Sequence, residues 1–262
     1  MEKLCSSIFK RGTIVISVDD NNAVDFRLYE DILLKHKIGA TFNVITSIID
    51  SEYRLTKEQL SIMHNNPLIE IAAHGHTHMN DDEDIIKGIE ALSDWLGIDK
   101  NAIGFASPRS EMGKKYIKEN AEHLKSLGLL YVRTADNREP NERHLAIQDD
   151  LAKKGVSNYV IFNVPQLTYS FDTMCVNSVV VYHDTDVNDL KALVDLAAEE
   201  KACIVFMFHN TKKKGEDSYD SRWSYDYDKF DEFAEYLSQK RTEGVVDILT
   251  NRQAFLIGSA LD

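Results

Sequence analysis

The stretch that decides the fold runs from Glu70 to His78 and reads EIAAHGHTH. A short apolar run comes first, and three histidines follow it within five residues. His74 and His78 are four residues apart, so a helical turn that starts here would place both imidazoles on one face. Two imidazoles on one face can ligate a divalent metal. His76 is two residues from each of them, and we expect its side chain to point elsewhere.

Short apolar or β-branched runs alternate with helical patterns along nearly the whole chain. Helices are expected at residues 114–127, 188–201 and 227–242, among others. Such alternation predicts an α/β fold in which parallel strands are joined by helical crossovers. We expect strands at 13–18, 40–45, 68–73, 103–106, 129–133, 202–208 and 245–249, and also at 159–164 and 178–182 within an irregular region that spans 136–178.

Two helix starts are marked by their residues. Thr56 and Gln59 form a capping-box pattern, which places the beginning of a helix at this point. The acidic residues at 81–83, which follow Asn80, suit the N-terminus of the next helix, and we interpret them as a helix start and not as a metal site.

Polar and histidine-rich residues follow several of the expected strands directly. They are Asp19 and Asp20 after the first strand, His74 to His78 after the third, residues 107–110 after the fourth, and His209 near the end of the chain. In α/β barrels the carboxyl ends of the strands carry the active site. Several strands that deliver such residues to one rim are a stronger signal than any single motif.

Composition excludes several classes of function. The chain has 262 residues, of which 43% are hydrophobic and 28% charged, and its net charge is −13. The negative charge disfavours nucleic acid and anionic membrane surfaces, which attract clustered lysines and arginines. No apolar run is long enough to cross a membrane, and the N-terminus shows no secretory signal. The three cysteines, Cys5, Cys175 and Cys203, are far apart and indicate a reducing compartment, so we expect a cytoplasmic protein.

The residues alone suggest a hydrolytic metal site. Such a site needs ligands that leave one position open, a base for the attacking water and an acid for the leaving group. Asp20, His74 and His78 can supply two imidazoles and a carboxylate. Asp19 faces differently in an extended segment and could remain unligated as the base, and His209 could be the acid.

Five short motifs occur in a fixed order along the chain. They are Ser17-Val18-Asp19-Asp20, Ala40-Thr41-Phe42-Asn43-Val44, His74-Gly75-His76-Thr77-His78, Phe105-Ala106-Ser107-Pro108-Arg109-Ser110 and Phe206-Met207-Phe208-His209. With these motifs the sequence resembles, from about Gly12 to Phe255, the polysaccharide deacetylase family, also called NodB-homology or carbohydrate esterase family 4 proteins.

The resemblance implies a distorted (β/α) barrel of seven or eight mostly parallel strands, which we expect to form a single domain over residues 1–262. It implies that Asp20, His74 and His78 bind one divalent metal. Zinc is the first choice, with cobalt, nickel, manganese or iron as alternatives. The family activity is removal of an N- or O-acetyl group from a sugar. Asp19 would be the general base and His209 the general acid, and a backbone N–H near Arg109 would help to hold the oxyanion.

Several positions depart from the family pattern. Asn21 stands where a glycine usually follows the two aspartates, and Ala106 replaces an arginine that orients the base in typical members. Arg109 or Arg133 could substitute for that arginine, and both are also candidates for substrate binding. Trp223 could line the substrate groove. We interpret His183 and Asp184 as loop residues and not as groups that orient His209.

Three functions therefore compete. The leading hypothesis is a metal-dependent deacetylase that acts on an acetylated sugar or glycan precursor. The second is hydrolysis of a C–N bond in a small amide that is not a sugar, because fold does not decide substrate. The third is a barrel that binds carbohydrate without catalysis. It is suggested by Ala106, which replaces the arginine that orients the base in typical members. The sequence leaves the oligomeric state open.

Overall fold

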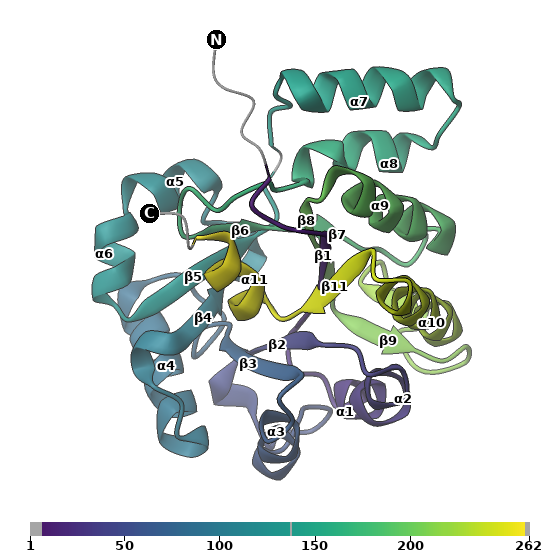
Figure 1. Ribbon diagram of the computed structural model, residues 1–262. Coiled ribbons are helices and arrows are strands. Elements are labelled where there is room, and N and C mark those ends of the chain that lie inside the picture. Colours follow the sequence, from purple (N-terminus) through teal and green to yellow (C-terminus); the bar gives the residue numbers. More distant parts are fainter. Residues whose placement is uncertain (1–6, 137, 260–262) are drawn as a thin grey trace.

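A computed structural model describes residues 7–136 and 138–259 (Figure 1), and Cys5 therefore lies outside the described residues. Most strands of the main sheet fall where the sequence predicts them, and all of their pairings are parallel. The strands of this sheet are β1 (Gly12–Asp19), β2 (Ala40–Val44), β3 (Ile69–Ala73), β4 (Ile103–Ala106), β5 (Leu129–Thr134), β6 (Cys175–Asn177), β7 (Val179–Val180), β8 (Cys203–Phe208) and β11 (Val246–Leu249).

The order of hydrogen-bonded strands is β6-β5-β4-β3-β2-β1-β8-β7, and β11 pairs with the first half of β1. The two ends of this order, β6 and β7, are separated in the chain only by Ser178. One extended segment thus pairs first with β5 and then with β8, and so brings the two edges of the sheet together. The predicted distorted (β/α) barrel of seven or eight mostly parallel strands is confirmed.

Helices surround the sheet (Figure 1). A short π-helical turn, Tyr29–Leu33, connects α1 to α2. The helices are α1 (Val24–Leu28), α2 (Leu34–His36), α3 (Lys57–His64), α4 (Asp82–Leu96), α5 (Lys114–Glu119), α6 (Ala121–Ser126), α7 (Glu142–Lys153), α8 (Asn158–Asn163), α9 (Val187–Glu200), α10 (Tyr227–Thr242) and α11 (Asn251–Gly258).

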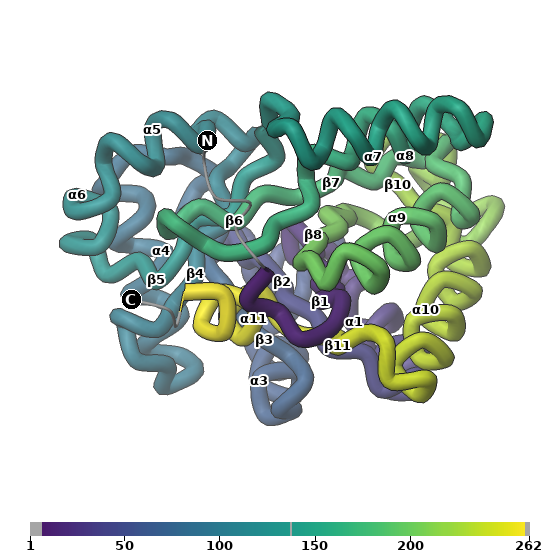
Figure 2. Tube along the Cα trace, turned by 45° about the horizontal axis from the view of Figure 1, so that its top comes forward, coloured from purple at the N-terminus to yellow at the C-terminus, as the bar shows by residue number. Residues whose placement is uncertain are grey.

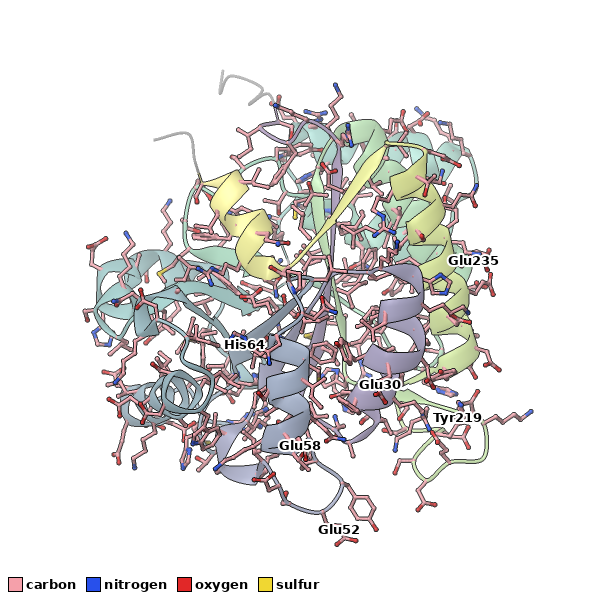
Figure 3. The ribbon with its side chains drawn as sticks, turned by 60° about the horizontal axis from the view of Figure 1, so that its bottom comes forward. Glu30, Glu52, Glu58, His64, Tyr219 and Glu235 are labelled. Carbon is pink, nitrogen blue, oxygen red and sulfur yellow. The ribbon has the colours of Figure 1, made fainter. Side chains whose placement is uncertain are left out.

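The helices are amphipathic: their apolar side chains face the sheet, and their polar side chains face outward. All eight residues of β1 are buried, because this strand lies between β2 and β11 on one side and β8 on the other. Glu30, Glu58 and Glu235 are exposed on the outward side of the helical layer (Figure 3). The core therefore lies between the sheet and the inner faces of the helices.

The expected helix starts are present. Thr56 accepts a hydrogen bond from the backbone N–H of Gln59, whose side chain returns one to Thr56, and this completes the capping box of α3. Asp81 caps α4 through the N–H of Asp84. The acidic run is therefore a helix start, as predicted.

The irregular region contains one clear error of prediction. Residues 159–164 were expected to form a strand, but Ser157 caps a helix at this point and α8 covers Asn158–Asn163. A short apolar run with β-branched residues fits a strand or a buried helix equally well, and here the cap decides. Helices α7, α8 and α9 contact one another in succession outside the sheet (Figure 2).

Two further observations bear on the sequence analysis. Cys175 and Cys203 are both buried and unpaired. Among the described residues, no helix combines the length and the apolar character that crossing a membrane requires.

A short second sheet consists of β9 (Asn210–Lys212) and β10 (Ser224–Asp226), which are parallel. It follows β8 directly and therefore lies at the carboxyl end of the barrel strands. The loop between its two strands carries Trp223.

Candidate metal and catalytic site

Acidic and imidazole side chains from strands far apart in the sequence meet at one end of the barrel. Asp19 is the last residue of β1, His74 follows the end of β3, and His209 follows the end of β8. The strands are parallel, so their carboxyl ends share one rim. The structure thus brings the predicted site residues together at the rim where we expected them.

The histidine loop differs from the helical turn that we expected. Residues 74–80 contain no helix, since β3 ends at Ala73 and α4 begins only at Asp82. Gly75 and His78 have positive φ angles of 78° and 66°, and these turn the loop sharply. The rings of His74 and His78 still meet, with centroids 4.8 Å apart. The proximity was predicted correctly, but the reason for it was wrong.

Asp84 fixes the shape of this loop from the first turn of α4. Its carboxylate accepts hydrogen bonds from the backbone N–H and the hydroxyl of Thr77 and from the backbone N–H of Met79. Burial raises the pKa of Asp84, but these hydrogen bonds outweigh it and leave the pKa below its usual value. A Cβ atom on Gly75 would come 2.5 Å from the Asp84 carboxylate, so the close approach requires glycine.

His76 points away from the other two rings, as expected. Its Nδ1 lies 2.9 Å from the hydroxyl oxygen of Thr46. The motif therefore supplies two imidazoles to the rim and one to the neighbouring 3₁₀ turn at Thr46–Ile48.

Asp20, His74 and His78 form a group that could hold a metal ion. Their ligand atoms all lie within 4.8 Å of one another. Nε2 of His74 lies 3.5 Å and Nε2 of His78 lies 3.8 Å from Oδ1 of Asp20. Nδ1 of His74 donates to the carbonyl oxygen of Ala106 at 2.8 Å, which leaves the Nε2 lone pair free for a metal. Two imidazole nitrogens and a carboxylate oxygen suit zinc and related divalent metals.

The charge states of these ligands fit the same role. Burial raises the pKa of Asp20, but hydrogen bonding and attraction to His74 lower it well below its usual value, so this group is a carboxylate. Burial and the neighbouring His74 lower the pKa of His78, which favours the neutral imidazole. An anionic oxygen and neutral nitrogens are the forms that bind metals.

Asp19 lies next to this group and is itself almost fully buried. Nη2 of Arg133 donates to both of its carboxylate oxygens at 2.5 Å, and Nδ2 of Asn43 donates to Oδ1 at 2.7 Å. Burial raises the pKa of Asp19, but Arg133, His74 and His209 together outweigh burial and lower it. Asp19 is therefore held as an anion whose orientation is fixed.

His209 lies at the same rim under an exposed aromatic ring. Its ring centroid is 4.6 Å from that of Trp223, which is 42% exposed. Burial lowers the pKa of His209 despite the nearby aspartates. Its buried Nδ1 has no hydrogen-bond partner among the described residues. His183 instead lies 3.2 Å from the carbonyl oxygen of Ser224, in agreement with a loop role.

Comparison with known families decides the relationship. The family model described as polysaccharide deacetylase matches residues 7–174, which is more than half of the chain. The chain belongs to the polysaccharide deacetylase family. The resemblance that the five motifs indicated is thereby confirmed. A search of curated proteins found no match.

Several solved structures are similar to this one. A polysaccharide deacetylase from Bacillus cereus is 16% identical with a TM-score of 0.48, and the match covers 69% of this chain and 51% of that chain. The Xyl-CE4 domain of a multidomain xylanase from the hindgut metagenome of Trinervitermes trinervoides is 13% identical with a TM-score of 0.48, and the match covers 94% of this chain and 90% of that chain. IcaB from Ammonifex degensii is 22% identical with a TM-score of 0.40, and the match covers 46% of this chain and 58% of that chain.

Two departures of this family member from the family pattern now have a structural account. Asn21 replaces the usual glycine and adopts a φ of 40°, a left-handed conformation that asparagine tolerates better than most residues. Its side-chain oxygen accepts a hydrogen bond from the N–H of Ile45. Ala106 replaces the usual arginine, and Arg133 from the neighbouring β5 provides a guanidinium to Asp19 instead.

Arg133 is placed differently from the substrate contact that we also considered. Its side chain is fully buried and contacts Asp19 and Met207, so it is shielded from an incoming ligand. Arg109 is exposed, with Nε 2.7 Å from a carboxylate oxygen of Glu111. Of these two arginines, Arg109 alone reaches the open surface of the rim.

Sequence reasoning missed what Asn43 and Asp84 do. Asn43 lies in the fully buried strand β2, where it donates to Asp19 and to Ser17. A polar amide within an otherwise apolar run was a usable signal, because buried polar groups need partners. Asp84 was concealed in the acidic start of α4, where a helix cap is the simpler interpretation.

Proposed function

We propose that this protein is a metal-dependent hydrolase that removes an N-acetyl or O-acetyl group from a sugar or glycan precursor. The observation that carries the proposal is the adjacency of two carboxylates in different environments. Asp20 faces two imidazoles, whereas Asp19 is held by Arg133 and Asn43. Such a division supplies a ligand and a base from consecutive residues of one strand end.

Asp20, His74 and His78 would hold the metal. When bound, a divalent metal such as zinc supplies a Lewis acid for the acetyl carbonyl and lowers the pKa of a water molecule. Asp19 is the base that accepts the proton of the attacking water. Because its pKa is lowered, Asp19 is a weak base. It can therefore accept a proton readily only from a water molecule whose own pKa is lowered.

His209, which follows the end of β8, donates a proton to the departing amine or alcohol. Burial lowers the pKa of His209, so the neutral ring is favoured, and the protonated ring is a stronger acid than an exposed imidazolium. Arg109 and Trp223 are exposed beside the ligands and His209 respectively, and we assign them to sugar contacts. The orientation of Asp19 is set by Arg133 and Asn43.

We also propose that residues 1–262 act as one domain. The late strand β11 pairs with β1, which carries Asp19, so the end of the chain is part of the same sheet as the site.

The test is acetate release by zinc-supplemented protein from N-acetylated oligosaccharides, beside a panel of O-acetylated sugars and small amides. Asp19→Asn should lower the rate by about 10² to 10⁴, the usual contribution of a positioned base. Asp94→Asn, an exposed aspartate on α4, is the matched control and should leave the rate unchanged.

Each outcome has a clear reading. Turnover of amides alone would replace the sugar substrate by a different class. Binding of oligosaccharide without acetate release, with Asp19→Asn equal to wild type, would identify a protein that binds carbohydrate without catalysis and would overturn the proposal.

A further inference from the structure

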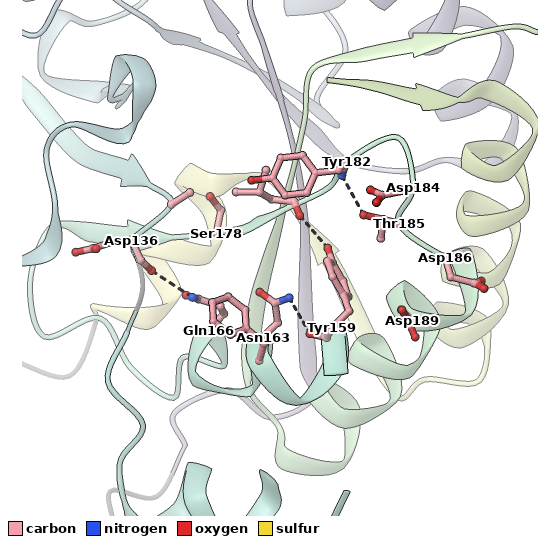
Figure 4. A pocket seen from close by; sticks show the side chains of 13 residues that line it. Asp136, Tyr159, Asn163, Gln166, Ser178, Tyr182, Asp184, Thr185, Asp186 and Asp189 are labelled. Carbon is pink, nitrogen blue, oxygen red and sulfur yellow. Dashed lines mark hydrogen bonds between the residues drawn. The ribbon is translucent and has the colours of Figure 1, made fainter. Parts of the chain in front are cut away.

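A cavity of about 600 Å³ is lined in part by residues that follow barrel strands, among them Ala135 and Asp136 after β5 and Tyr182 after β7 (Figure 4). Its walls come from the loop after β5, from α8, from the closing segment β6–β7 and from the start of α9. The irregular region of the sequence thus builds one complete wall. None of the proposed metal ligands or catalytic residues lines the cavity.

Contacts connect this cavity to the candidate centre on two sides. Tyr182 lines it and packs against Trp223 with centroids 5.5 Å apart, and Trp223 packs against His209. Ala135 also lines it, and its N–H donates to the hydroxyl of Ser110, which follows Arg109 in the turn after β4. These contacts place Tyr182 one side chain away from His209, and Ala135 next to the turn that carries Arg109.

Aromatic rings form much of the wall. Tyr159 is fixed by a hydrogen bond from its hydroxyl to the carbonyl oxygen of Val180. Phe162 is 62% exposed, which is unusual for a large apolar side chain unless it serves a contact. Tyr182 is held between Trp223 and the guanidinium of Arg222, which lies 4.2 Å from its ring centroid. Rigid aromatic faces with polar groups between them are typical of ligand sites.

The polar part of the wall is strongly acidic. Four aspartates line the cavity, and none of its lining residues is a lysine or an arginine; Asp136, Asp184, Asp186 and Asp189 are the four. Three of them also serve the fold: Asp136 accepts from the N–H of Lys114, Asp189 accepts from Ser157, and Asp186 caps α9. Asp184 is exposed and has no such role among the described contacts. A cation fits this wall better than a neutral group or an anion.

We propose that this cavity binds an amino-sugar unit with a free, protonated amine, next to the unit that is being deacetylated. The proposal rests on the proposed function, because that reaction produces such amines on a glycan. The aromatic rings would contact the sugar face, and Asp184 and Asp186 would attract the ammonium group. The enzyme would then favour glycans that already carry free amines.

The experiment measures binding of a glucosamine tetramer and of the glucose tetramer with the same linkage, by calorimetry at low and at high salt. Neither compound carries an acetyl group, so the result does not depend on turnover. We expect the glucosamine tetramer to bind about tenfold more tightly at low salt, an amount that two partly exposed ion pairs can supply. High salt should reduce this difference.

The double variant Asp184→Asn with Asp186→Asn should abolish the preference. Asparagine caps a helix as well as aspartate does, so α9 should remain intact. The matched control is the double variant Asp94→Asn with Asp99→Asn. It changes one exposed aspartate and one capping aspartate that do not line the cavity, and it should keep the preference for the glucosamine tetramer.

Equal binding of the two tetramers, or a preference that persists in the double variant, would overturn the proposal. A preference for glucosamine without acetate release from any substrate would leave the cavity assignment intact and reject the proposed function. Acetate release without a preference for the glucosamine tetramer would support the proposed function and reject the cavity assignment.

Discussion

Nη2 of Arg133 lies 2.5 Å from both carboxylate oxygens of Asp19, and both side chains are almost completely removed from solvent. The two residues are 114 positions apart and come from strands that are not neighbours in the sheet. A buried carboxylate requires a partner of opposite charge, and here one guanidinium provides it. The pair therefore links the stability of the barrel to the orientation of the proposed base.

Arg133→Met should destabilise the protein strongly, because it leaves the carboxylate of Asp19 buried without its cation. We expect a loss of about 3–5 kcal/mol in the free energy of unfolding, measured by urea denaturation. Adding Asp19→Asn should recover part of this loss. Arg11→Met is the control: its ion pair with Asp247 is exposed, so the loss should stay below about 1 kcal/mol. An equal effect of both substitutions would contradict the assignment.

Metal binding should depend on two of the three histidines in the motif. His74→Ala and His78→Ala should each lose the metal that wild type retains, because their nitrogens meet Asp20. His76→Ala should keep it, since that ring contacts Thr46. Elemental analysis of the purified proteins after addition of zinc gives the answer. Loss of metal in all three variants would show that the whole loop is needed and would remove the distinction drawn here.

Asp84 should influence metal affinity without touching the metal. Asp84→Asn keeps the size of the side chain but weakens the hydrogen bonds that shape the loop between His74 and His78. We expect zinc to bind about 10–100-fold more weakly in a competition assay with a chelator, as is usual when a group that supports a ligand is lost. Asp82→Asn changes an exposed residue on the same helix turn and should have no effect.

Asp25 predicts a dependence of stability on pH. Its side chain is fully buried in α1, and neither carboxylate oxygen has a hydrogen-bond partner among the described residues. Burial raises its pKa well above the usual value of 3.8. The folded protein therefore binds the proton more tightly than the unfolded chain, and ionisation at higher pH favours unfolding.

Near pH 3.8 the Asp25→Asn variant should therefore be no more stable than wild type. As the pH rises towards neutrality, the stability of the variant should increase relative to that of wild type. At pH 7 we expect the variant to be more stable than wild type, because the raised pKa of Asp25 makes ionisation of this buried carboxyl unfavourable in the folded state. Urea denaturation at several pH values provides the measurement. A difference that does not change with pH would show that the effect is packing and not ionisation.

The sequence predicted the arrangement of the barrel because local patterns were sufficient for it. Runs such as 13–18 and 202–208 are long enough and apolar enough to mark buried strands, and the helical patterns between most of them require parallel pairing. The positions of Asp19, Asp20, His74 and His209 at one rim follow from this topology alone. Five motifs in a fixed order were also sufficient to indicate the family.

Local patterns failed where two structures compete for the same residues. Residues 159–164 carry side chains that suit a strand or a buried helix, and the Ser157 cap, together with the packing of α8 against α7 and α9, makes the helix the better solution. His74 and His78 have helical spacing, yet the loop brings them together through positive φ angles at Gly75 and His78. In the histidine loop, the hydrogen bonds from Thr77 and Met79 to Asp84 outweigh the local preference.

Tertiary structure alone decided which groups contact Asp19 and what surrounds the acidic cavity. From the sequence, Arg133 was a candidate both for substrate binding and for orienting the base, and Asn43 was only part of a strand. The register of the sheet places both beside the carboxylate of Asp19. Sequence determines the period and polarity of each element, because these depend on neighbouring residues. The pairing of buried charges depends on which side chains meet across the barrel, and that is settled only when the strands close around their common core.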